Sequence, residues 1–303
     1  MIFDCAIIGG GPAGLNAALV LGRARRKMVL FDDNKPRNAV TQESHGFITR
    51  DGVKPSEFRE IAHRDIAKYP DVQFRPDKVT QVTKENEGEI TFELVTEVGE
   101  SYRARTIILA TGLKEIFPSI PGIRDYYGKS IFSCPYCDGW ELRNKPLVAI
   151  TETEHAYRIT KVVSNWSKDV ILCTNGSDKL TPEQRQALKT KQISVYDQKI
   201  HSLAGANGLL KQIKFEDGSE ILREGGFLAM PWKQATTIAE SLGCEINTHL
   251  GIVTDVLGRT NIPGVYAAGD MSVNGPAQLI NAAAEGSKAA IGVNTDLIEK
   301  EFI

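Results

Sequence analysis

The stretch FDCAIIGGGPAG, residues 3–14, predicts a buried strand that runs directly into a glycine-rich turn. Gly9, Gly11 and Gly14 fit the pattern G-x-G-x-x-G, and the residues that follow have the apolar spacing of a helix. Glycines in such a turn let backbone N–H groups approach a pyrophosphate at the start of a helix. The stretch therefore predicts a parallel α/β fold with a dinucleotide site.

A second strand completes this βαβ opening. MVLF, residues 28–31, is apolar throughout and ends at Asp32, which lies 18 positions after Gly14. A carboxylate at this place suits a ribose hydroxyl of a dinucleotide. With the strand, the helix and the acidic residue all in place, the motif is a strong indication, and a glycine turn that serves only packing is the alternative.

The pattern begins again in the middle of the chain. LVAI at 147–150, a helix over roughly 154–166 and VILCT at 170–174 predict a second βαβ unit, and GVYAAGD at 264–270 with a helix from about Pro276 returns to the first. We therefore expect two Rossmann-like α/β domains, the second inserted into the first, with limits 1–117, 118–243 and 244–303. The other expected elements are a helix at 55–69, antiparallel meanders near 72–83 with 89–96 and through 192–216, strands at 106–112 and 225–231, and an interdomain linker at 113–122.

The charge pattern excludes several partners. The formal net charge is -2, and the chain lacks the clustered basic patch that nucleic acid or a membrane surface requires. The uncharged stretch 5–22 contains five glycines and a proline, which fits a strand, turn and helix better than a membrane span or a signal peptide. We expect a cytoplasmic protein that binds neither nucleic acid nor membranes.

Two of the five cysteines form a close pair, SCPYCDG at 133–139. Cys134 and Cys137 have the C-x-x-C spacing of a redox dithiol, and Pro135 suits the first turn of a helix that would stabilise a thiolate. Asp138 could transfer a proton to or from the neighbouring thiol. A zinc site would require a second such pair and no histidine has a partner at metal spacing, so we expect no metal; a purely structural pair is the other alternative. Cys5, Cys173 and Cys244 are expected to be buried thiols.

The glycine turn, TIILATG at 106–112 and the Gly269–Asp270 pair together resemble the FAD-binding sequences of two-dinucleotide flavoprotein reductases. The resemblance implies that Asp270 holds the ribityl chain of FAD and that Ala277, Gln278 and Leu279 lie against its isoalloxazine ring. The positions expected to contact FAD are Gly9, Gly11, Pro12, Ala13, Gly14, Asp32, Asp33, Arg37, Asn38, His45, Val79, Ala110, Thr111, Gly112, Gly269, Asp270, Ala277, Gln278 and Leu279.

With C-P-Y-C-D-G in the inserted part, essentially the whole chain resembles the low-molecular-weight thioredoxin reductase family. This resemblance implies three-layer ββα domains, a homodimer with FAD, and a small dithiol or a thioredoxin-like protein as substrate. It also implies that Cys137 faces the flavin, that Cys134 attacks the substrate disulfide and that Asp138 is the acid–base residue.

One expected feature of that family is missing. Members that use NADPH carry a glycine turn in the inserted domain and a basic cluster after the next strand. Here PLVAITETEHAYRIT, residues 146–160, puts Thr151, Thr153 and Ala156 at the glycine positions, and Thr174-Asn175-Gly176 contains no basic residue. Side chains would block the close approach of a pyrophosphate, and Glu152 and Glu154 would repel it. The chain is therefore expected not to use NADPH directly.

Electrons then need another route. The first alternative is a dithiol oxidase with oxygen as acceptor; the segment 34–52 resembles that branch, and its His45 is expected near the flavin or as a base. Asp138 is typical of the reductases instead, and the oxidases often have histidine there. The second alternative is a reductase with a protein donor such as ferredoxin. An NADPH-dependent thioredoxin reductase and a flavin-bound redox sensor with little turnover remain as further alternative functions. For His45, the alternative is an ordinary loop residue without a role in the chemistry.

Overall fold

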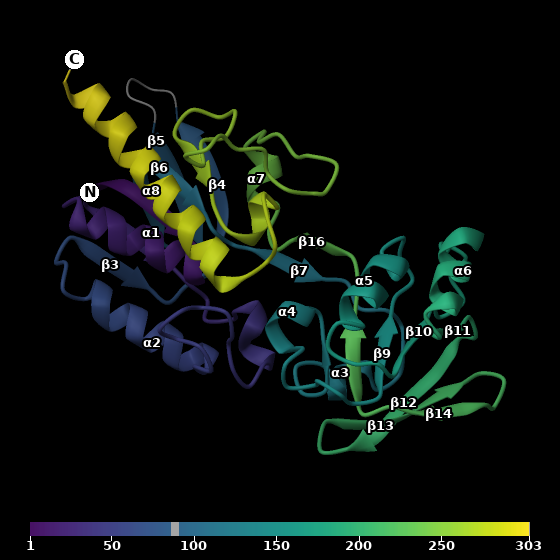
Figure 1. Cartoon of the computed structure of the whole chain (residues 1–303). Helices are drawn as coiled ribbons and strands as arrows, with labels where there is room; N and C mark the ends of the chain where they lie inside the picture. Colours follow the sequence, from purple (N-terminus) through teal and green to yellow (C-terminus); the bar gives the residue numbers. More distant parts are fainter. Residues whose placement is uncertain (86–90, 303) are drawn as a thin grey trace. The chain divides into compact units, whose positions relative to one another are not determined.

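The computed structural model describes residues 1–85 and 91–302 and has two Rossmann-like sheets, the second inserted into the first, so the predicted fold class is confirmed (Figure 1). The contacts between residues divide the chain into two compact units. The first unit comprises residues 1–39, 46–114 and 233–303, and the second unit comprises 40–45 and 115–232. The domain limits given above stay a prediction, because compact units and folding domains need not coincide.

The first unit is built on a seven-stranded sheet. Its order is β3-β2-β1-β6-β5-β4, and β17 also pairs with β6. β1, β2, β3, β6 and β17 are parallel, whereas β4 and β5 continue from β6 as antiparallel strands. The strands are β1 (Ile2–Ile8), β2 (Met28–Phe31), β3 (Val72–Arg75), β4 (Val79–Glu85), β5 (Thr91–Thr96), β6 (Ser101–Leu109) and β17 (Val265–Ala267).

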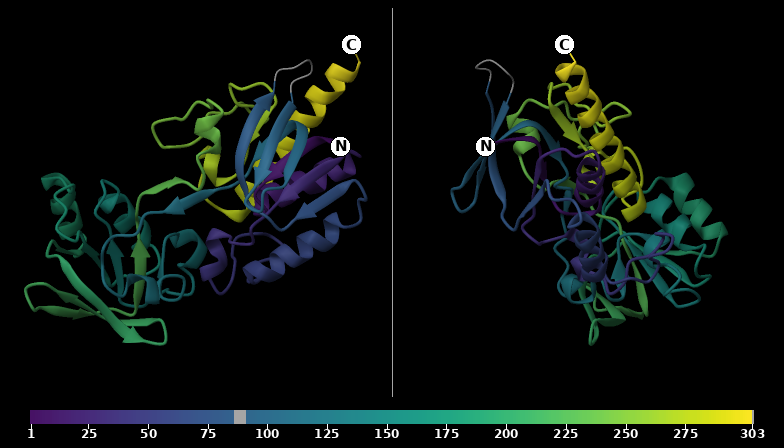
Figure 2. Two further views of the ribbon diagram at one scale, coloured as in Figure 1. Left: turned by 180° about the vertical axis from the view of Figure 1, so that it is seen from behind. Right: turned by 90° about the vertical axis from the view of Figure 1, so that its left-hand side faces the viewer.

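Alternate side chains of this sheet enter two different cores. Cys5 and Ile7 of β1 pack beneath helices α1 (Pro12–Arg23) and α8 (Leu279–Glu301), whereas Ala6 and Ile8 pack against β4, β5 and α7 (Ile238–Ser241). Strand segments with both faces buried are apolar at every position, as residues 5–8 of β1 and all of β2 are. Figures 1 and 2 show α1 and α8 side by side over one face, with α2 (Pro55–Ile66) next to α1.

The expected meander at 72–83 is wrong in one part. Residues 72–75 form β3, which pairs in parallel with β2, and only residues 79–85 join the antiparallel strands. The two strands separate at Pro76 and Asp77, where proline cannot donate a hydrogen bond to a ladder. Of the expected strand at 89–96, residues 91–96 form β5, and 89 and 90 lie outside the described residues.

The second unit has a five-stranded parallel sheet in the order β11-β10-β9-β15-β8. A separate antiparallel sheet, β12-β13-β14, covers one face through a core that includes Val148 and Ile150, while α5 and α6 cover the other. The predicted three layers are therefore present. The elements are α3 (Ile123–Tyr126), β8 (Ile131–Phe132), α4 (Pro135–Asp138), β9 (Leu147–Ile150), α5 (Ala156–Val163), β10 (Val170–Cys173), α6 (Pro182–Thr190), β11 (Ser194–Tyr196), β12 (Ile200–Ala206), β13 (Leu209–Phe215), β14 (Glu220–Leu222) and β15 (Gly225–Leu228).

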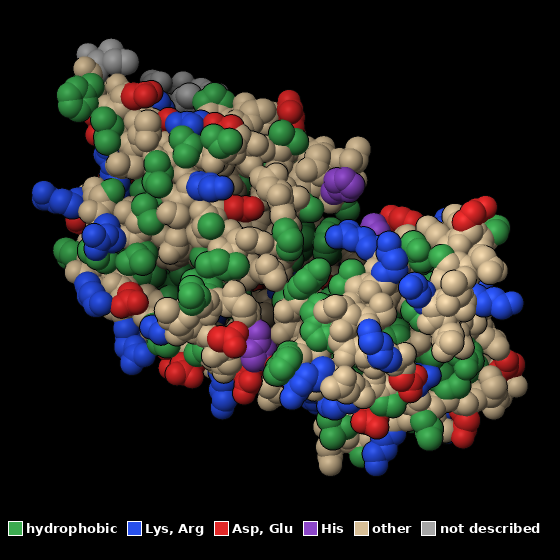
Figure 3. Space-filling view, in the orientation of Figure 1, with side chains coloured by type: hydrophobic (Ala, Val, Ile, Leu, Met, Phe, Trp, Pro, Cys, Tyr) green, Lys and Arg blue, Asp and Glu red, His purple; other side chains and the backbone are tan. Residues whose placement is uncertain are grey.

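The expected linker 113–122 contains regular structure. Its first residues form β7 (Leu113–Glu115), which pairs with β16 (Trp232–Gln234) where the chain returns. On the face seen in Figure 3, both basic and acidic side chains are present. Within residues 1–85 and 91–302, the helices are all too short or too polar to cross a membrane.

Candidate functional site

The carboxyl ends of four parallel strands bring most of the predicted FAD residues to one edge of the first sheet. β1, β2, β6 and β17 run in the same direction, so the turns that follow them share an edge. Ligands in open α/β sheets bind outside such an edge. The turns that meet there are 9–14, 32–34, 110–112 and 268–270.

The geometry of the first turn explains its glycines and fits a dinucleotide. A Cβ on Gly9, whose φ is +112°, would lie 2.3 Å from the carbonyl oxygen of Ala110, and a Cβ on Gly14 would lie 1.8 Å from that of Gly9. A Cβ on Gly11 would have no such neighbour within 4 Å. The turn is thus closed on its protein side and open at Gly11, where a pyrophosphate can approach the start of α1.

A second group of polar residues lies at the Gly269–Asp270 turn. Arg37 Nη2 is 2.9 Å from Asp270 Oδ2, so two residues predicted to contact FAD contact each other. Glu285 on α8 accepts hydrogen bonds from the Gly269 N–H at 2.8 Å and from the Ser272 hydroxyl at 2.6 Å. Glu285 therefore fixes this turn, and the sequence carried no motif that identified it.

The remaining predicted FAD positions differ in how they are placed. Gln278 occupies the N-cap position of α8 without a side-chain capping bond, and Leu279 is the first residue of the helix, so 277–279 lead into that helix as expected. The side chain of Val79, the first residue of β4, is only 2% exposed and belongs to the core, so only the backbone of Val79 is open to a ligand.

The other predicted positions lie at the turns and helix starts. The Thr111 hydroxyl donates to the sulfur of Met271 at 3.6 Å. The side chain of Asp33 is exposed. Pro12 and Ala13 begin α1, and Asn38 lies in the 3-10 helix η1 (Arg37–Val40).

The dithiol lies in the second unit. Cys134 and Cys137 form a disulfide, and Pro135 is the first residue of α4, as predicted. Both cysteines are half-buried. Cys5, Cys173 and Cys244 are buried free thiols as expected, and burial raises the pKa of Cys5 and of Cys173 to about 12. Those two thiols stay protonated at neutral pH, so they cannot compete as nucleophiles.

Asp138 follows the disulfide and has the electrostatics of an acid–base group. Burial, together with the negative charge of Glu141, raises the pKa of Asp138 to about 7, and His45 opposes this rise. His45 Nε2 lies 3.6 Å from Glu43 and 3.7 Å from Glu141, so the loop 40–45 belongs to the second unit. A carboxyl with a pKa near neutrality can both donate and accept a proton. The predicted contact of His45 with a flavin stays a prediction.

Replacing Glu141 with glutamine is expected to lower the pKa of Asp138. The substitution removes a neighbouring negative charge that disfavours the carboxylate form, while burial, which is the larger cause, remains. The pKa should therefore fall below about 7 but stay above the ordinary value near 4. An infrared titration of the protonated carboxyl band would measure it.

Glu43→Gln is the matched control for this titration. Glu43 also contacts His45, but its charge is not among the causes that raise the pKa of Asp138. This variant should therefore leave the midpoint near that of the wild type. An unchanged midpoint in Glu141→Gln would contradict the assignment of Glu141.

In the turn after β9, threonine hydroxyls form hydrogen bonds with backbone N–H groups of the same turn. Thr151 Oγ1 accepts from the Thr153 N–H at 3.1 Å, and Thr153 Oγ1 accepts from the His155 N–H at 3.3 Å. Glu152 accepts a hydrogen bond from the side chain of Asn175, at the end of β10. Threonine hydroxyls therefore stand at two of the expected glycine positions, and the carboxylate of Glu152 bonds to Asn175, which lies where the basic cluster is expected.

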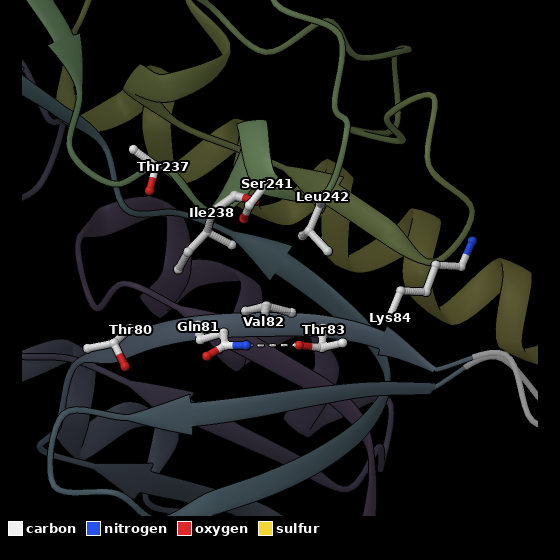
Figure 4. Close-up of a pocket in the computed structure, with 9 residues that line it drawn as sticks. All are labelled: Thr80, Gln81, Val82, Thr83, Lys84, Thr237, Ile238, Ser241 and Leu242. Carbon is white, nitrogen blue, oxygen red and sulfur yellow. Dashed lines mark hydrogen bonds between the residues drawn. The ribbon is translucent and has the colours of Figure 1, made fainter.

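A pocket of about 530 Å³ lies elsewhere, between β4 and α7 (Figure 4). Its lining residues are Thr80, Gln81, Val82, Thr83, Lys84, Thr237, Ile238, Ser241 and Leu242. The hydroxyls of Thr80 and Ser241 donate to the backbone, and Gln81 bonds to Thr83. The lining contains neither a glycine-turn residue nor a cysteine, so we place the chemistry at the strand ends and the disulfide.

Comparisons with known proteins agree with this geometry. The family model for pyridine nucleotide-disulphide oxidoreductases matches residues 3–286. Thioredoxin reductase aclD from Aspergillus oryzae is 32% identical over 98% of this chain and 96% of its own length. A Bacillus anthracis structure assigned as thioredoxin reductase TrxB is 48% identical, covers 99% of each chain and has a TM-score of 0.94. The structure of an oxidoreductase from Agrobacterium tumefaciens is 30% identical over 98% of this chain and 99% of its own, with a TM-score of 0.91.

The chain belongs to the pyridine nucleotide-disulphide oxidoreductase family and, within it, to the low-molecular-weight thioredoxin reductases. It is a thioredoxin reductase-like FAD oxidoreductase with a C-x-x-C disulfide. The family implies the flavin, and the open side of the glycine turn fits one.

Proposed function

We propose that this enzyme exchanges electrons between its FAD and a dithiol–disulfide pair through Cys134 and Cys137, without NADPH as direct donor. The favoured direction is oxidation of a small dithiol, with dioxygen as the final acceptor. The observation that carries the proposal is the turn after β9, in which two threonine hydroxyls bond the backbone N–H groups of Thr153 and His155.

This turn opposes a nucleotide in two ways. A pyrophosphate at the start of a helix relies on free backbone N–H groups, and here two of them are already bonded. The carboxylate of Glu152 would also repel the phosphate charge. Two unit charges about 4 Å apart near a protein surface interact by about 4 kcal/mol, which is enough to abolish useful binding.

The residues directly after β10, 174–176, include no basic side chain, although Lys199 lies against Gly176. Asn175 bonds to Glu152, and the nearby Arg185 on α6 is engaged by both oxygens of Asp197, at 2.7 and 2.9 Å. Thr174 also donates to Asp197. A bidentate pair of this kind leaves the guanidinium with little to offer a 2′-phosphate. Both halves of the ordinary NADPH site thus favour a protein that does without the nucleotide.

The proposed exchange begins when a substrate thiolate attacks the sulfur of Cys134. The Cys134–Cys137 bond breaks, and Cys137 leaves as a thiolate that takes a proton from Asp138. The second substrate thiol then attacks the mixed disulfide, releases Cys134 and leaves the substrate oxidised by two electrons. When bound, FAD supplies the two-electron step that returns the enzyme dithiol to the disulfide and delivers both electrons to dioxygen as hydrogen peroxide.

Aromatic side chains next to the disulfide support a substrate with apolar groups. Tyr136, between the two cysteines, is 71% exposed, and Trp140 is 65% exposed. Tyr136 is held edge-to-face by Trp166 at 5.4 Å, and Arg143 lies 4.1 Å over the Trp140 ring. Rigid aromatic rings of this kind provide contact area at a small entropic cost. The names of the relatives make a thioredoxin-like protein the other substrate to test.

Anaerobic absorbance of the flavin tests the proposal directly. A small dithiol should bleach the oxidised flavin, whereas NADPH at the same concentration should not; admitting air should restore the colour and form one peroxide per dithiol. Rapid bleaching by NADPH would overturn the proposal and make the enzyme an NADPH-dependent reductase. Bleaching by neither reagent would favour a protein donor such as ferredoxin, which would be added next.

A further inference from the structure

Arg59 on α2 connects the two turns that are expected to hold the adenosine half of FAD. Its guanidinium donates to the carbonyl oxygen of Gly10 at 3.0 Å and to Asn34 Oδ1 at 3.0 Å, and it forms an ion pair with the carboxylate of Asp32. Gly10 lies in the turn after β1, and Asp32 and Asn34 follow β2. One side chain therefore fixes the phosphate turn relative to the ribose carboxylate.

Fold stability alone is a poor account of this ion pair. The side chains of Arg59 and Asp32 are only 12% and 15% exposed. Burying two charges costs roughly as much as their attraction returns, so apolar residues at such positions are often at least as stabilising. The guanidinium instead has a fixed fork of donors that suits three acceptors at once. Its placement is typical of a group that orients a binding residue.

The carboxylate of Asp32 is held from both oxygens. Oδ1 accepts the Asn34 N–H at 3.1 Å, while Oδ2 faces Arg59. The carboxylate also lies against the glycine turn, since a Cβ on Gly10 would be 2.4 Å from Oδ2. An ionised carboxylate has about four acceptor positions, so roughly two remain for the ribose hydroxyls.

A charge argument leads to the same residue. The pyrophosphate expected at Gly11 is negatively charged, and an unneutralised carboxylate one turn away would oppose it. Arg59 supplies the compensating positive charge from the side of α2. We propose that Arg59 is a positioning residue for the adenosine half of FAD: it aims Asp32 at the ribose and neutralises it beside the pyrophosphate.

The affinity of the apoprotein for FAD gives the first test. Arg59→Met should weaken FAD binding about 10- to 100-fold, the range expected when hydrogen bonds to a charged group are lost. Quenching of flavin fluorescence measures this without turnover, thiols or NADPH, so the outcome is independent of the proposed function. Arg64→Met is the matched control, because Arg64 is exposed on the same helix, and this variant should bind FAD like the wild type.

The ribose itself gives the second test, which a merely structural role would not affect. ADP and 2′-deoxy-ADP would be compared as competitors of FAD. In the wild type, ADP should bind about tenfold more tightly, because only its ribose presents the 2′-hydroxyl to Asp32. In Arg59→Met this preference should shrink to about twofold or less, because the carboxylate is no longer aimed.

The conservative variant separates charge from geometry. Arg59→Lys keeps the positive charge but loses the fork, so FAD affinity should be intermediate while the preference for ADP stays low. Thermal unfolding of each apoprotein shows whether it is folded, and the ratio of ADP to 2′-deoxy-ADP affinity remains informative in a destabilised variant. An undiminished preference in Arg59→Met, wild-type FAD affinity in that variant, or no preference in the wild type would each overturn the proposal.

Discussion

Replacing Cys137 with serine is expected to lower dithiol turnover by at least about 1000-fold while the protein stays yellow. The reason is chemical: a serine oxygen cannot form the bond to Cys134 that the substrate thiolate must break, so the exchange has no starting disulfide. FAD is expected at the strand ends of the first unit, to which Cys137 does not belong, so its binding should survive. Dithiol-dependent bleaching and the bound flavin content are the two measurements.

Cys244→Ser is the matched control for this variant. Cys244 is a free, buried thiol in the first unit, and its sulfur lies 4.0 Å from the Thr260 hydroxyl, which can accept a serine hydroxyl. This variant should oxidise dithiols at the wild-type rate. Normal turnover by Cys137→Ser would show that electrons reach the flavin without the disulfide, and the proposed path would be wrong.

The sequence predicted the FAD edge of the first sheet because the relevant rules are local and topological. Gly9 and Gly14 have steric reasons that any strand–turn–helix of this kind shares. Parallel strands then bring Asp32, Gly112 and Asp270 to the same edge although they are far apart in the chain. Apolar runs predicted the strands, and the two-residue period divided their side chains between two cores.

Other parts depend on packing that a single sequence does not reveal. Arg59 and Glu285 look like ordinary charged residues of amphipathic helices, and only the fold places them at the nucleotide turns. The loop with His45 packs with the dithiol unit, and nothing in its composition indicates which unit it joins; its expected contact with the flavin stays a prediction. The parallel pairing of β3 is likewise a long-range choice that its pattern of half-buried residues cannot specify.

The turn after β9 could be predicted from the sequence only in part. Missing glycines predicted that it would not hold a nucleotide, and the structure adds how the turn is maintained. Threonine hydroxyls bonding the N–H two residues later, at Thr153 and His155, are local interactions that threonine commonly makes. The bond between Glu152 and Asn175 required the neighbouring strand.

Replacing Asp138 with asparagine is expected to slow the opening of the disulfide about 100-fold or more at pH 6, the usual scale of general acid catalysis. Asparagine keeps the shape of the side chain but cannot deliver a proton to the departing Cys137 thiolate. Stopped-flow reduction of the disulfide by a small dithiol, under anaerobic conditions, measures this step by itself.

The pH dependence of that step has a definite sign. The pKa of Asp138 is raised to about 7 by burial first and Glu141 second, so the proton donor is present below pH 7 and lost above it. Rates expressed per substrate thiolate should therefore be constant in acid and fall as pH rises through about 7. In Asp138→Asn this falling limb should be absent, and a limb that persists would assign the proton donor to another group.

Folding stability provides an independent measurement of the same carboxyl. A raised pKa means that the folded protein holds this proton more tightly than the unfolded chain, in which the pKa is near 4. Its contribution to stability is complete below about pH 4 and is lost as pH rises through about 7. Asp138→Asn, which resembles the neutral acid, should gain stability relative to the wild type between these values. The gain should level off near the folded-state pKa of about 7, and agreement between that pH and the midpoint of the rate profile would assign both to Asp138.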